Sequence, residues 1–307
     1  MAKVLVATVK PFAPDAVIQI REIIESAGYE FTLLEKYADQ SGLLSAVADA
    51  DALIVRSDNI DKQVIEAASS LKIIVRAGAG YDNIDLEAAS AKNIVVMNTP
   101  GQNSNAVAEL AFGMMVYLSR NSFSGTSGTE IGGKTLGLHA YGNVGKRVAH
   151  IARGFDMDVY AYDPFIDASV IEKDGVKCLD SAESLYRTSQ YLSLHIPSTE
   201  QTRGSINYDL LSLMPRGAML INTARNEVID EASLVRMFEE REDFRYVSDV
   251  SPDVADLLED KFPGRVYFTP KKMGAQTEEA NVNAGMAAAR QIVSYIERGD
   301  TTFQVNP

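Results

Sequence analysis

The sequence predicts an α/β protein of about two domains, each built around a sheet of parallel strands. Short β-rich runs alternate with helical periodicity along almost the whole chain, as expected when helices connect parallel strands. One segment, residues 133–163, has the complete order strand, glycine-containing turn, helix and strand. The length of 307 residues is sufficient for about two domains with sizeable cores.

The first third of the chain contains four predicted strands. They are the β-rich runs Val4–Thr8, Ala52–Arg56, Ile73–Ala77 and Ile94–Asn98. Helical stretches are predicted near 14–27, 61–70 and 85–92. A long helix is predicted over about Asn105–Arg120, and the Ser- and Gly-rich stretch Ser124–Gly133 is predicted to be a flexible loop.

The segment 133–163 carries the strongest functional signal. A predicted strand, Thr135–His139, runs into the turn Ala140-Tyr141-Gly142-Asn143-Val144-Gly145, and a second strand, Val159–Tyr162, ends at Asp163. In such a unit the glycines let the backbone approach a pyrophosphate, the helix N-terminus supplies free N–H groups, and the acid accepts from the adenine ribose hydroxyls. We therefore expect a dinucleotide. NAD is favoured over NADP, because no arginine follows Asp163 to bind a 2′-phosphate.

Two residues of this unit leave alternatives open. Ala140 stands where the pattern has its first glycine, and we expect this alanine to be tolerated with a negative φ. Asp163 is either the ribose ligand or a surface carboxylate before the turn Pro164-Phe165.

The second half of the chain continues the alternation. Strands are predicted at 191–195, 219–222, 246–250 and 266–269, with helices between them. The last helix, about Thr277–Arg298, has apolar residues at helical spacing. We expect it to close back on the first domain.

Composition and charge exclude several classes of function. The net charge of −13 argues against a general nucleic-acid surface, and an anionic substrate needs a local cationic pocket to overcome this field. No apolar run is long enough to span a membrane. Cys178 is the only cysteine, so no intrachain disulfide is expected, and the first residues show neither a signal peptide nor a transit peptide. We expect a cytoplasmic protein without a bound metal.

Six motifs resemble the D-isomer-specific 2-hydroxyacid dehydrogenase family. They are VRAGAGYDNID (75–85), NTPGQNSNAVAELAFGMM (98–115), GKTLGLHAYGNVGKRVA (133–149), LHIPSTEQTRG (194–204), LINTARNEVIDEASL (220–234) and TPKKMGAQTEEA (269–280). The resemblance implies two Rossmann-like domains with parallel sheets: a cofactor domain, 99–277, inserted in a discontinuous substrate domain, 1–98 plus 278–307. It also implies a homodimer built on the cofactor domain and its long helix.

The resemblance implies the residues that contact the cofactor. They are Tyr141, Gly142, Asn143, Val144, Gly145, Asp163, Pro164, His195, Ile196, Pro197, Thr202, Thr223, Ala224, Arg225, Asp249 and Gly274. Among them, Asp249 matches the residue that holds the nicotinamide carboxamide.

The family's catalytic arginine and histidine are only partly matched. Arg225, in the motif NTAR, matches the arginine that holds the substrate carboxylate and carbonyl, which suits its planar fork of donors; the alternative is a structural salt bridge. Lys272 occupies the histidine position when counted back from Gly274, whereas counting forward from Pro270 selects Lys271. A lysine with the ordinary pKa of about 10.4 needs burial beside Arg225 to act as the base near neutral pH.

Three further alternatives concern the acid–base groups. His195, in the His-x-Pro turn, is a weaker candidate acid. The family's glutamate position holds Val254, and Asp253 beside it is either a replacement carboxylate or a turn residue after Pro252. A lysine needs no carboxylate to fix an imidazole tautomer, so we hypothesise that the histidine and the glutamate were lost together. Alternatively, Lys271 and Lys272 are a solvated pair on a loop without a catalytic role.

Substrate contacts are expected mainly from the first domain. The candidates are Arg56, Ser57, Arg76, Ala77, Gly78, Ala79 and Asn103, together with Arg225 and Lys272. The glycines after Arg76 are expected to leave backbone N–H groups open to an anion. Phosphate binding and a surface salt bridge are equally compatible with Arg56. Arg56, Arg225 and Lys272 carry more positive charge than a monoanionic hydroxy acid requires, which favours a phosphorylated acid.

The resemblance is greatest to short phosphoglycerate dehydrogenases that lack a regulatory domain. It implies NAD-dependent oxidation of D-3-phosphoglycerate to 3-phosphohydroxypyruvate, the entry to serine synthesis, without serine feedback through such a domain. Reduction of hydroxypyruvate or glyoxylate is a nearby alternative. A non-catalytic NAD-binding sensor or scaffold is the alternative from another class of function.

Overall fold

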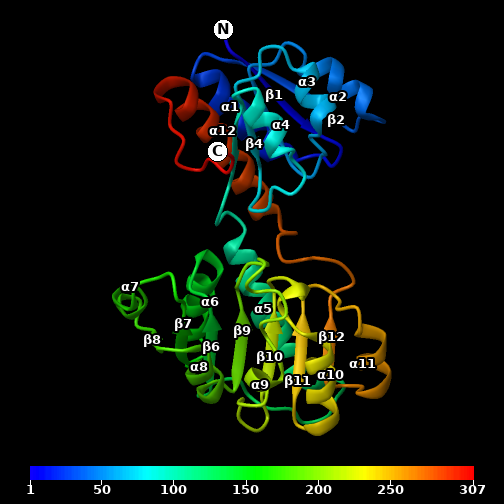
Figure 1. Ribbon diagram of the computed structural model, residues 1–307, viewed down its shortest axis with the longest axis vertical. Coiled ribbons are helices and arrows are strands. Elements are labelled where there is room, and N and C mark those ends of the chain that lie inside the picture. Colours follow the sequence, from blue (N-terminus) through cyan, green and yellow to red (C-terminus); the bar gives the residue numbers. More distant parts are fainter. The chain divides into compact units, whose positions relative to one another are not determined.

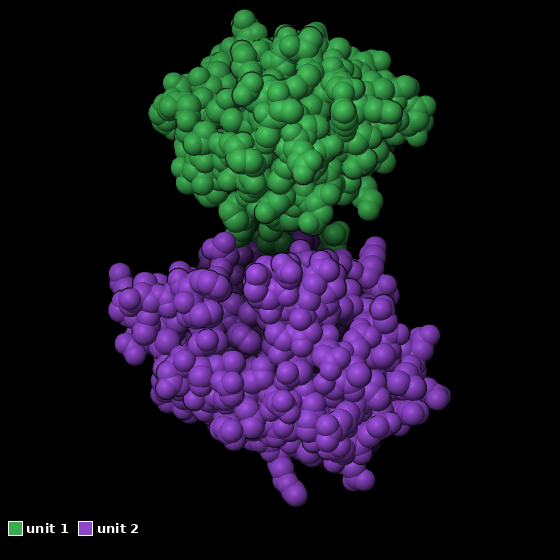
Figure 2. All heavy atoms as spheres, in the orientation of Figure 1, with its two compact units in different colours: residues 1–103, 276–307 green, residues 104–275 purple.

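The computed structural model describes residues 1–307, which divide into two compact units (Figure 2). Unit 1 comprises residues 1–103 and 276–307, and unit 2 comprises residues 104–275. All strand pairs in both sheets are parallel. The predicted α/β class is therefore confirmed.

Unit 1 is a five-stranded sheet with helices on both faces, in the strand order β2-β1-β3-β4-β5. Its strands are β1 (Lys3–Thr8), β2 (Glu30–Glu35), β3 (Ala52–Val55), β4 (Ile73–Arg76) and β5 (Val95–Asn98). Its helices are α1 (Pro14–Ser26), α2 (Gln40–Val47), α3 (Lys62–Ala67), α4 (Leu86–Ala91) and α12 (Glu278–Arg298).

The alternation of side chains along each strand divides the core of unit 1 into two layers. Val4 and Val6 point to the face covered by α1 and α12, whereas Leu5 and Ala7 point to the face covered by α2, α3 and α4. Figure 1 shows α1 and α12 side by side. They pack closely because residue 285 is a glycine: a Cβ there lies only 2.6 Å from Ile20 Cδ1. The last helix thus returns to the first part of the chain.

The C-terminal residues complete the edge of this sheet. Asn306 Oδ1 accepts a 2.7 Å hydrogen bond from the N–H of Val96, and its Nδ2 donates to the carbonyl of Ile94 at 2.9 Å. Gln304 pairs antiparallel with Met97. These bonds satisfy backbone groups of edge strand β5, which are otherwise open to pairing with another chain.

Unit 2 is a seven-stranded sheet in the order β12-β11-β10-β9-β6-β7-β8. Its strands are β6 (Thr135–His139), β7 (Asp158–Tyr162), β8 (Lys177–Cys178), β9 (Tyr191–Leu194), β10 (Met219–Asn222), β11 (Arg245–Ser248) and β12 (Val266–Phe268). Its helices are α5 (Ser104–Ser119), α6 (Asn143–Arg153), α7 (Ala168–Lys173), α8 (Ala182–Thr188), α9 (Tyr208–Leu211), α10 (Glu231–Glu240) and α11 (Ala255–Lys261), with 3₁₀ turns at Asn121–Phe123 and Asn226–Val228.

The strand order reverses between β6 and β9. The chain moves outward from β6 to β7 and β8, and then returns to start β9 on the other side of β6. Helices α5, α6 and α7 cover one face, and α8, α9, α10 and α11 cover the other. In open α/β sheets, ligands bind outside the carboxyl ends of the strands at such a reversal, which places the candidate cofactor site of unit 2 there.

Two strands were not predicted from sequence. β2 is an edge strand in which only Phe31 is buried, and β8 has two residues. Of the stretch predicted as a loop, Ile131 is buried against the core of unit 2. No helix in the structure has the length and apolar character needed to cross a membrane.

Candidate functional site

The glycine turn of unit 2 leads from β6 directly into α6. Gly142 is the N-cap of α6 and no side chain caps the helix, so the N–H groups of the first turn remain available to a ligand. At Gly145 a Cβ lies 2.6 Å from the carbonyl oxygen of Ala140, so only glycine permits this tight turn. The uncapped helix end and the missing side chain at Gly142 fit a pyrophosphate.

Ala140 differs from the expectation of a negative φ. Its φ is +80°, and its N–H donates to the carbonyl of Tyr162 at 2.9 Å. The turn geometry therefore imposes the left-handed conformation of the glycine pattern on a residue with a Cβ. That conformation costs an L-residue roughly 1–2 kcal/mol, so the surrounding hydrogen bonds must hold it.

The carboxylate of Asp163 links the end of β7 to the glycine turn. Its Oδ2 accepts from the N–H of Tyr141 at 2.8 Å, and its Oδ1 accepts from the N–H of Phe165 at 2.9 Å. The side chain of Tyr141 is fully buried and its hydroxyl donates to Asp174 Oδ2 at 3.1 Å. Tyr141 thus shapes the turn through its backbone, while Asp163 is half-buried beside it, with lone pairs remaining for ribose hydroxyls.

Two histidines, the buried His139 and the half-buried His195, lie at the carboxyl ends of β6 and β9. The N–H of His195 donates to the carbonyl of His139 at 2.9 Å, and His139 Nδ1 lies 3.3 Å from the hydroxyl of Tyr186. Burial lowers the pKa of His139 to about 4 and that of His195 to about 3; the neighbouring His139 lowers the latter further. Both imidazoles are neutral at pH 7. A neutral His195 is a poor proton donor, which weighs against its candidacy as the acid.

Several buried polar atoms near the carboxyl ends of β9 and β10 have no partner in the protein. They are His195 Nε2, Ser198 Oγ, Thr223 Oγ1 and Asn226 Oδ1. Thr202 Oγ1 donates to the carbonyl of Pro197 and closes the loop after β9, where Ile196 is buried and Pro197 is exposed. Buried polar groups are normally satisfied, so these atoms fit a polar ligand such as a dinucleotide.

Arg225 lies just beyond β10. Its carbonyl accepts from Asn222 Nδ2 at 3.0 Å, and the N–H of Ala224 donates to Asn222 Oδ1 at 2.9 Å, so the amide of Asn222 fixes this turn. The guanidinium is half-buried and donates to the carbonyl of Ala224 at 2.9 Å. The ion pairs of unit 2 do not include Arg225. Most of its donors therefore remain for a carboxylate.

The two candidate lysines lie on the loop that follows β12. Lys271 and Lys272 are both exposed, so neither has the burial that was expected of a lysine base near neutral pH, whereas Gly274 behind them is buried. Asp249, after β11, is 1% exposed and accepts hydrogen bonds from this loop. The loop and the Arg225 turn thus lie beyond the carboxyl ends of neighbouring strands, since β10, β11 and β12 are adjacent.

Asp253 and Val254 lie in the turn before α11. Val254 is the N-cap residue of this helix and makes no side-chain cap. Asp253 is exposed, and its N–H donates to Glu231 Oε1 at 2.9 Å. The sequence left two alternatives for Asp253, a catalytic carboxylate or a turn residue after Pro252. Its surroundings match those of a turn residue.

In unit 1, Arg56 directly follows β3, and Arg76 is the last residue of the adjacent strand β4. Arg56 Nη1 donates to the carbonyls of Lys10 (2.9 Å) and Pro11 (2.8 Å), and its Nη2 donates to Asn281 Oδ1. Arg76 Nε donates to the carbonyl of Arg56 at 3.0 Å. Burial lowers the pKa of both guanidinium groups, and the charge of Arg56 lowers the pKa of Arg76 further. Neither belongs to the ion pairs of unit 1.

The backbone after Arg76 is less open than the sequence suggests. The N–H of Ala77 donates to the carbonyl of Val55 and the N–H of Gly78 to that of Arg76, so neither is open to an anion. The bond from Ala77 continues the parallel hydrogen-bond ladder of β3 and β4 to residue 77, where the predicted strand also ends. Ala79 is exposed, and its carbonyl accepts from Asn98 Nδ2 at 2.6 Å.

The remaining substrate candidates of unit 1 have different surroundings. Ser57 is exposed and lines a cavity of about 540 Å³ with Tyr37 and Asp58, beyond β1, β2 and β3. Asn103, the last residue of the first segment of unit 1, is half-buried.

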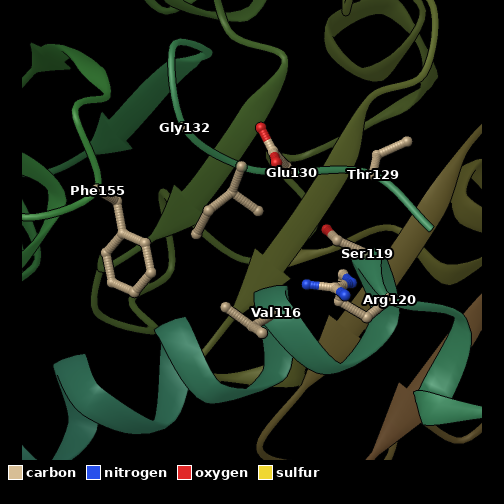
Figure 3. Close-up of a pocket in the computed structure, with 8 residues that line it drawn as sticks. Val116, Ser119, Arg120, Thr129, Glu130, Gly132 and Phe155 are labelled. Atoms are coloured by element: carbon tan, nitrogen blue, oxygen red, sulfur yellow. The ribbon is translucent and has the colours of Figure 1, made fainter. Parts of the chain in front are cut away.

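A second cavity, in unit 2, was not predicted. It has a volume of about 260 Å³ and lies between the end of α5 and the segment 129–132 (Figure 3). Val116 and Phe155 contribute apolar surface, and Arg120 and Glu130 contribute charges. The composition of the Ser- and Gly-rich stretch gave no signal for it, because the cavity depends on how this stretch folds against α5.

Comparisons with known proteins agree on one family. Residues 116–262 match the model described as D-isomer specific 2-hydroxyacid dehydrogenase, NAD binding domain. A D-3-phosphoglycerate dehydrogenase of Methanocaldococcus jannaschii is 36% identical over 285 residues, covering 86% of this chain and 53% of that protein. A hydroxypyruvate reductase of Thermotoga maritima is 34% identical over 281 residues, covering 86% of this chain and 90% of that protein.

A solved structure with a related sequence extends over the whole chain. The crystal structure of NAD⁺-bound 3-phosphoglycerate dehydrogenase from Entamoeba histolytica has 49% sequence identity and a TM-score of 0.86, and covers 100% of this chain and 99% of that one. The chain therefore spans about half the length of the Methanocaldococcus relative but nearly all of the Entamoeba protein.

Proposed function

Because the chain belongs to the D-isomer-specific 2-hydroxyacid dehydrogenase family and contains its NAD-binding domain, we propose that it oxidises D-3-phosphoglycerate to 3-phosphohydroxypyruvate with NAD. This reaction is the entry to serine biosynthesis. The observation that carries the choice of substrate is the pair Arg56 and Arg76, two adjacent, half-buried guanidinium groups without an ion-pair partner in unit 1. A phosphate dianion supplies the missing negative charge.

In the proposed reaction, Arg225 and Lys272 have separate tasks. Arg225 grips the substrate carboxylate and stabilises charge on the oxygen at C2. Lys272 Nζ takes the proton of the C2 hydroxyl as the carbonyl forms, and returns it in the reverse direction. NAD supplies the acceptor for the hydride that leaves C2. Proton and hydride together account for the two electrons and two hydrogens removed.

Unit 2 is proposed to hold the NAD. The first turn of α6 and Gly142 receive the pyrophosphate, Asp163 receives the adenine ribose, and the unpartnered atoms of His195 and Thr223 face the rest of the dinucleotide. Unit 1 is proposed to hold the substrate. Its fit to a cofactor is poorer, because the glycines that follow β4 do not lead directly into a helix: residues 81–85 separate Gly80 from α4.

Within unit 1, Arg76 is the better candidate for the phosphate. Arg56 already donates to two backbone carbonyls and to Asn281, whereas Arg76 is committed through Nε only. The terminal nitrogens of Arg76 extend over Gly78, where a Cβ has no room. We therefore assign the phosphate grip to Arg76, whose side chain is held through Nε by the carbonyl of Arg56.

Two other functions have specific support. Reduction of hydroxypyruvate is favoured by the Thermotoga relative, of which the chain covers 90%. A non-catalytic NAD sensor accounts for the missing histidine and glutamate. Arg225 weighs against the sensor, because an arginine outside any ion pair of unit 2 has no evident structural task.

The assembly is proposed to be a homodimer formed through unit 2. The cavity at the end of α5 has a lining that is partly apolar, and Phe123, three residues after Arg120 of that lining, is 65% exposed. An aromatic ring this exposed suits a partner surface. A cytoplasmic location is proposed on the basis of the single, unpaired Cys178.

The decisive experiment follows NADH formation from D-3-phosphoglycerate as a function of pH in the parent chain, Lys272→Met and Lys271→Met. NAD affinity is measured for all three by calorimetry. We expect turnover in the parent and in Lys271→Met, and none in Lys272→Met despite unchanged NAD binding. An active Lys272→Met variant contradicts the role of this lysine. NAD binding without turnover of D-3-phosphoglycerate, hydroxypyruvate or glyoxylate by the parent supports the sensor instead.

A further inference from the structure

One buried carboxylate binds both flanks of the lysine loop. Asp249 Oδ1 accepts from Thr269 Oγ1 at 3.0 Å and from the N–H of Met273 at 2.7 Å. Its Oδ2 accepts from the N–H of Gly274 at 2.8 Å. Asp249 and Thr269 are 1% and 2% exposed, so these bonds are shielded from water. The segment 270–272, which contains both lysines, is thus closed at its two ends on the same side chain.

The close approach of Gly274 strengthens this arrangement. A Cβ at residue 274 lies 2.8 Å from Asp249 Oδ2 and 3.1 Å from Val107 Cγ2, so a side chain there forces the loop away from the carboxylate. The glycine and the carboxylate are complementary, and together they define a single path for the loop.

The backbone of Asp249 connects the same residue to the turn of Arg225. The N–H of Asp249 donates to the carbonyl of Asn222 at 2.9 Å, and Asn222 Nδ2 donates to the carbonyl of Arg225 at 3.0 Å. The backbone that carries the arginine and the backbone that carries the lysines are therefore linked through Asn222, the last residue of β10, and Asp249, the residue directly after β11. A fixed spacing between two groups that act on one substrate is what catalysis requires.

We propose that Asp249 and Thr269 are positioning residues, which hold the loop so that the ammonium of Lys272 meets the substrate hydroxyl while Arg225 holds the carboxylate. The inference rests on the proposed function. A lysine side chain has four rotatable bonds, so its reach to a defined point depends on where its backbone starts. The loop anchor sets that starting point, through bonds that do not involve the cofactor.

Thr269→Val and Thr269→Ser form a matched pair that tests this role. Valine keeps the volume of threonine but removes the donor to Asp249, and serine restores the donor. Asp249 itself is left intact, because it also matches the residue expected to contact the nicotinamide. Hydrogen–deuterium exchange of the peptide 270–276 reports the loop, calorimetry reports NAD affinity, and steady-state kinetics separate kcat from KM.

In Thr269→Val we expect exchange at Met273 and Gly274 to rise on the order of tenfold. We expect kcat to fall by about ten- to a hundredfold, with NAD affinity and KM changed less than about twofold, and Thr269→Ser to recover both readings. Unchanged exchange, or faster exchange with unchanged kcat, overturns the positioning role while the parent remains active. A parent chain without turnover overturns the proposed function, and the inference with it.

Discussion

The side chain of Arg76 donates from Nε to the backbone carbonyl of Arg56, at 3.0 Å. This bond holds two positive side chains at the ends of adjacent strands, although the charge of Arg56 lowers the pKa of Arg76. The terminal nitrogens of Arg56 donate to backbone carbonyls and to Asn281, whereas those of Arg76 remain for a ligand. The relationship predicts which arginine determines the substrate.

Replacement of Arg76 by methionine is expected to raise KM for D-3-phosphoglycerate by roughly 10- to 100-fold, because a charge-assisted hydrogen bond to the phosphate is lost. KM for hydroxypyruvate, which has no phosphate, is expected to change little. Steady-state kinetics with both compounds measures the ratio. An equal loss with both compounds contradicts a phosphate-specific role.

Gly78→Ala is expected to impair the same contact without removing any charge. A Cβ at residue 78 lies 1.4 Å from Arg76 Nη1, so the guanidinium must move. The φ of +152° adds backbone strain for any other residue. We expect a higher KM for the phosphorylated substrate and unchanged NAD affinity, measured by kinetics and calorimetry. Gly28→Ala is the matched control, because it also has a positive φ but no neighbour within 4 Å of the added methyl group.

Ala140→Gly is expected to stabilise unit 2. The φ of +80° is strained for alanine and unstrained for glycine, while glycine loses more backbone entropy on folding. The difference between the two effects is about 0.5–1 kcal/mol in favour of the variant. Thermal and urea unfolding measure it. Lower stability of the variant argues that the turn gains more from a restricted backbone than it loses to strain.

Acid is expected to destabilise unit 2 through His139 and His195. Their folded-state pKa values, about 4 for His139 and about 3 for His195, lie below the usual 6.5, so the unfolded chain binds protons first as the pH falls. Their contribution is fully present above pH 6.5 and is lost progressively down to about pH 3. For His139 the loss at pH 4 is on the order of 3 kcal/mol.

The measurement is urea unfolding between pH 7 and pH 4 for the parent, His139→Gln and His150→Gln. We expect a shallower pH dependence for the first variant, because glutamine does not titrate. His150 is exposed on α6, and its replacement should leave the slope unchanged. Parallel slopes in all three proteins exclude His139 as the source of the acid sensitivity.

The elements predicted from sequence are those that local pattern determines. Strands β6 and β10 were placed at their observed bounds because strands buried on both faces read as continuous apolar runs. β2 was not predicted, because an edge strand with one buried residue has no such continuous apolar run. The roles of individual arginines were not predictable either. The acceptors of Arg56 come from residues 10, 11 and 281, which only the tertiary fold brings together.

The return of α12 to unit 1 has a consequence for synthesis on the ribosome. Residues 1–103 are made first, yet the face of α1 that includes Ile20 stays uncovered until Gly285 and its helix emerge. Unit 2 is one continuous stretch and is complete before then. Unit 1, whose first segment is synthesised first, is therefore the last to fold. In the nascent chain it exposes an apolar surface to which chaperones can bind.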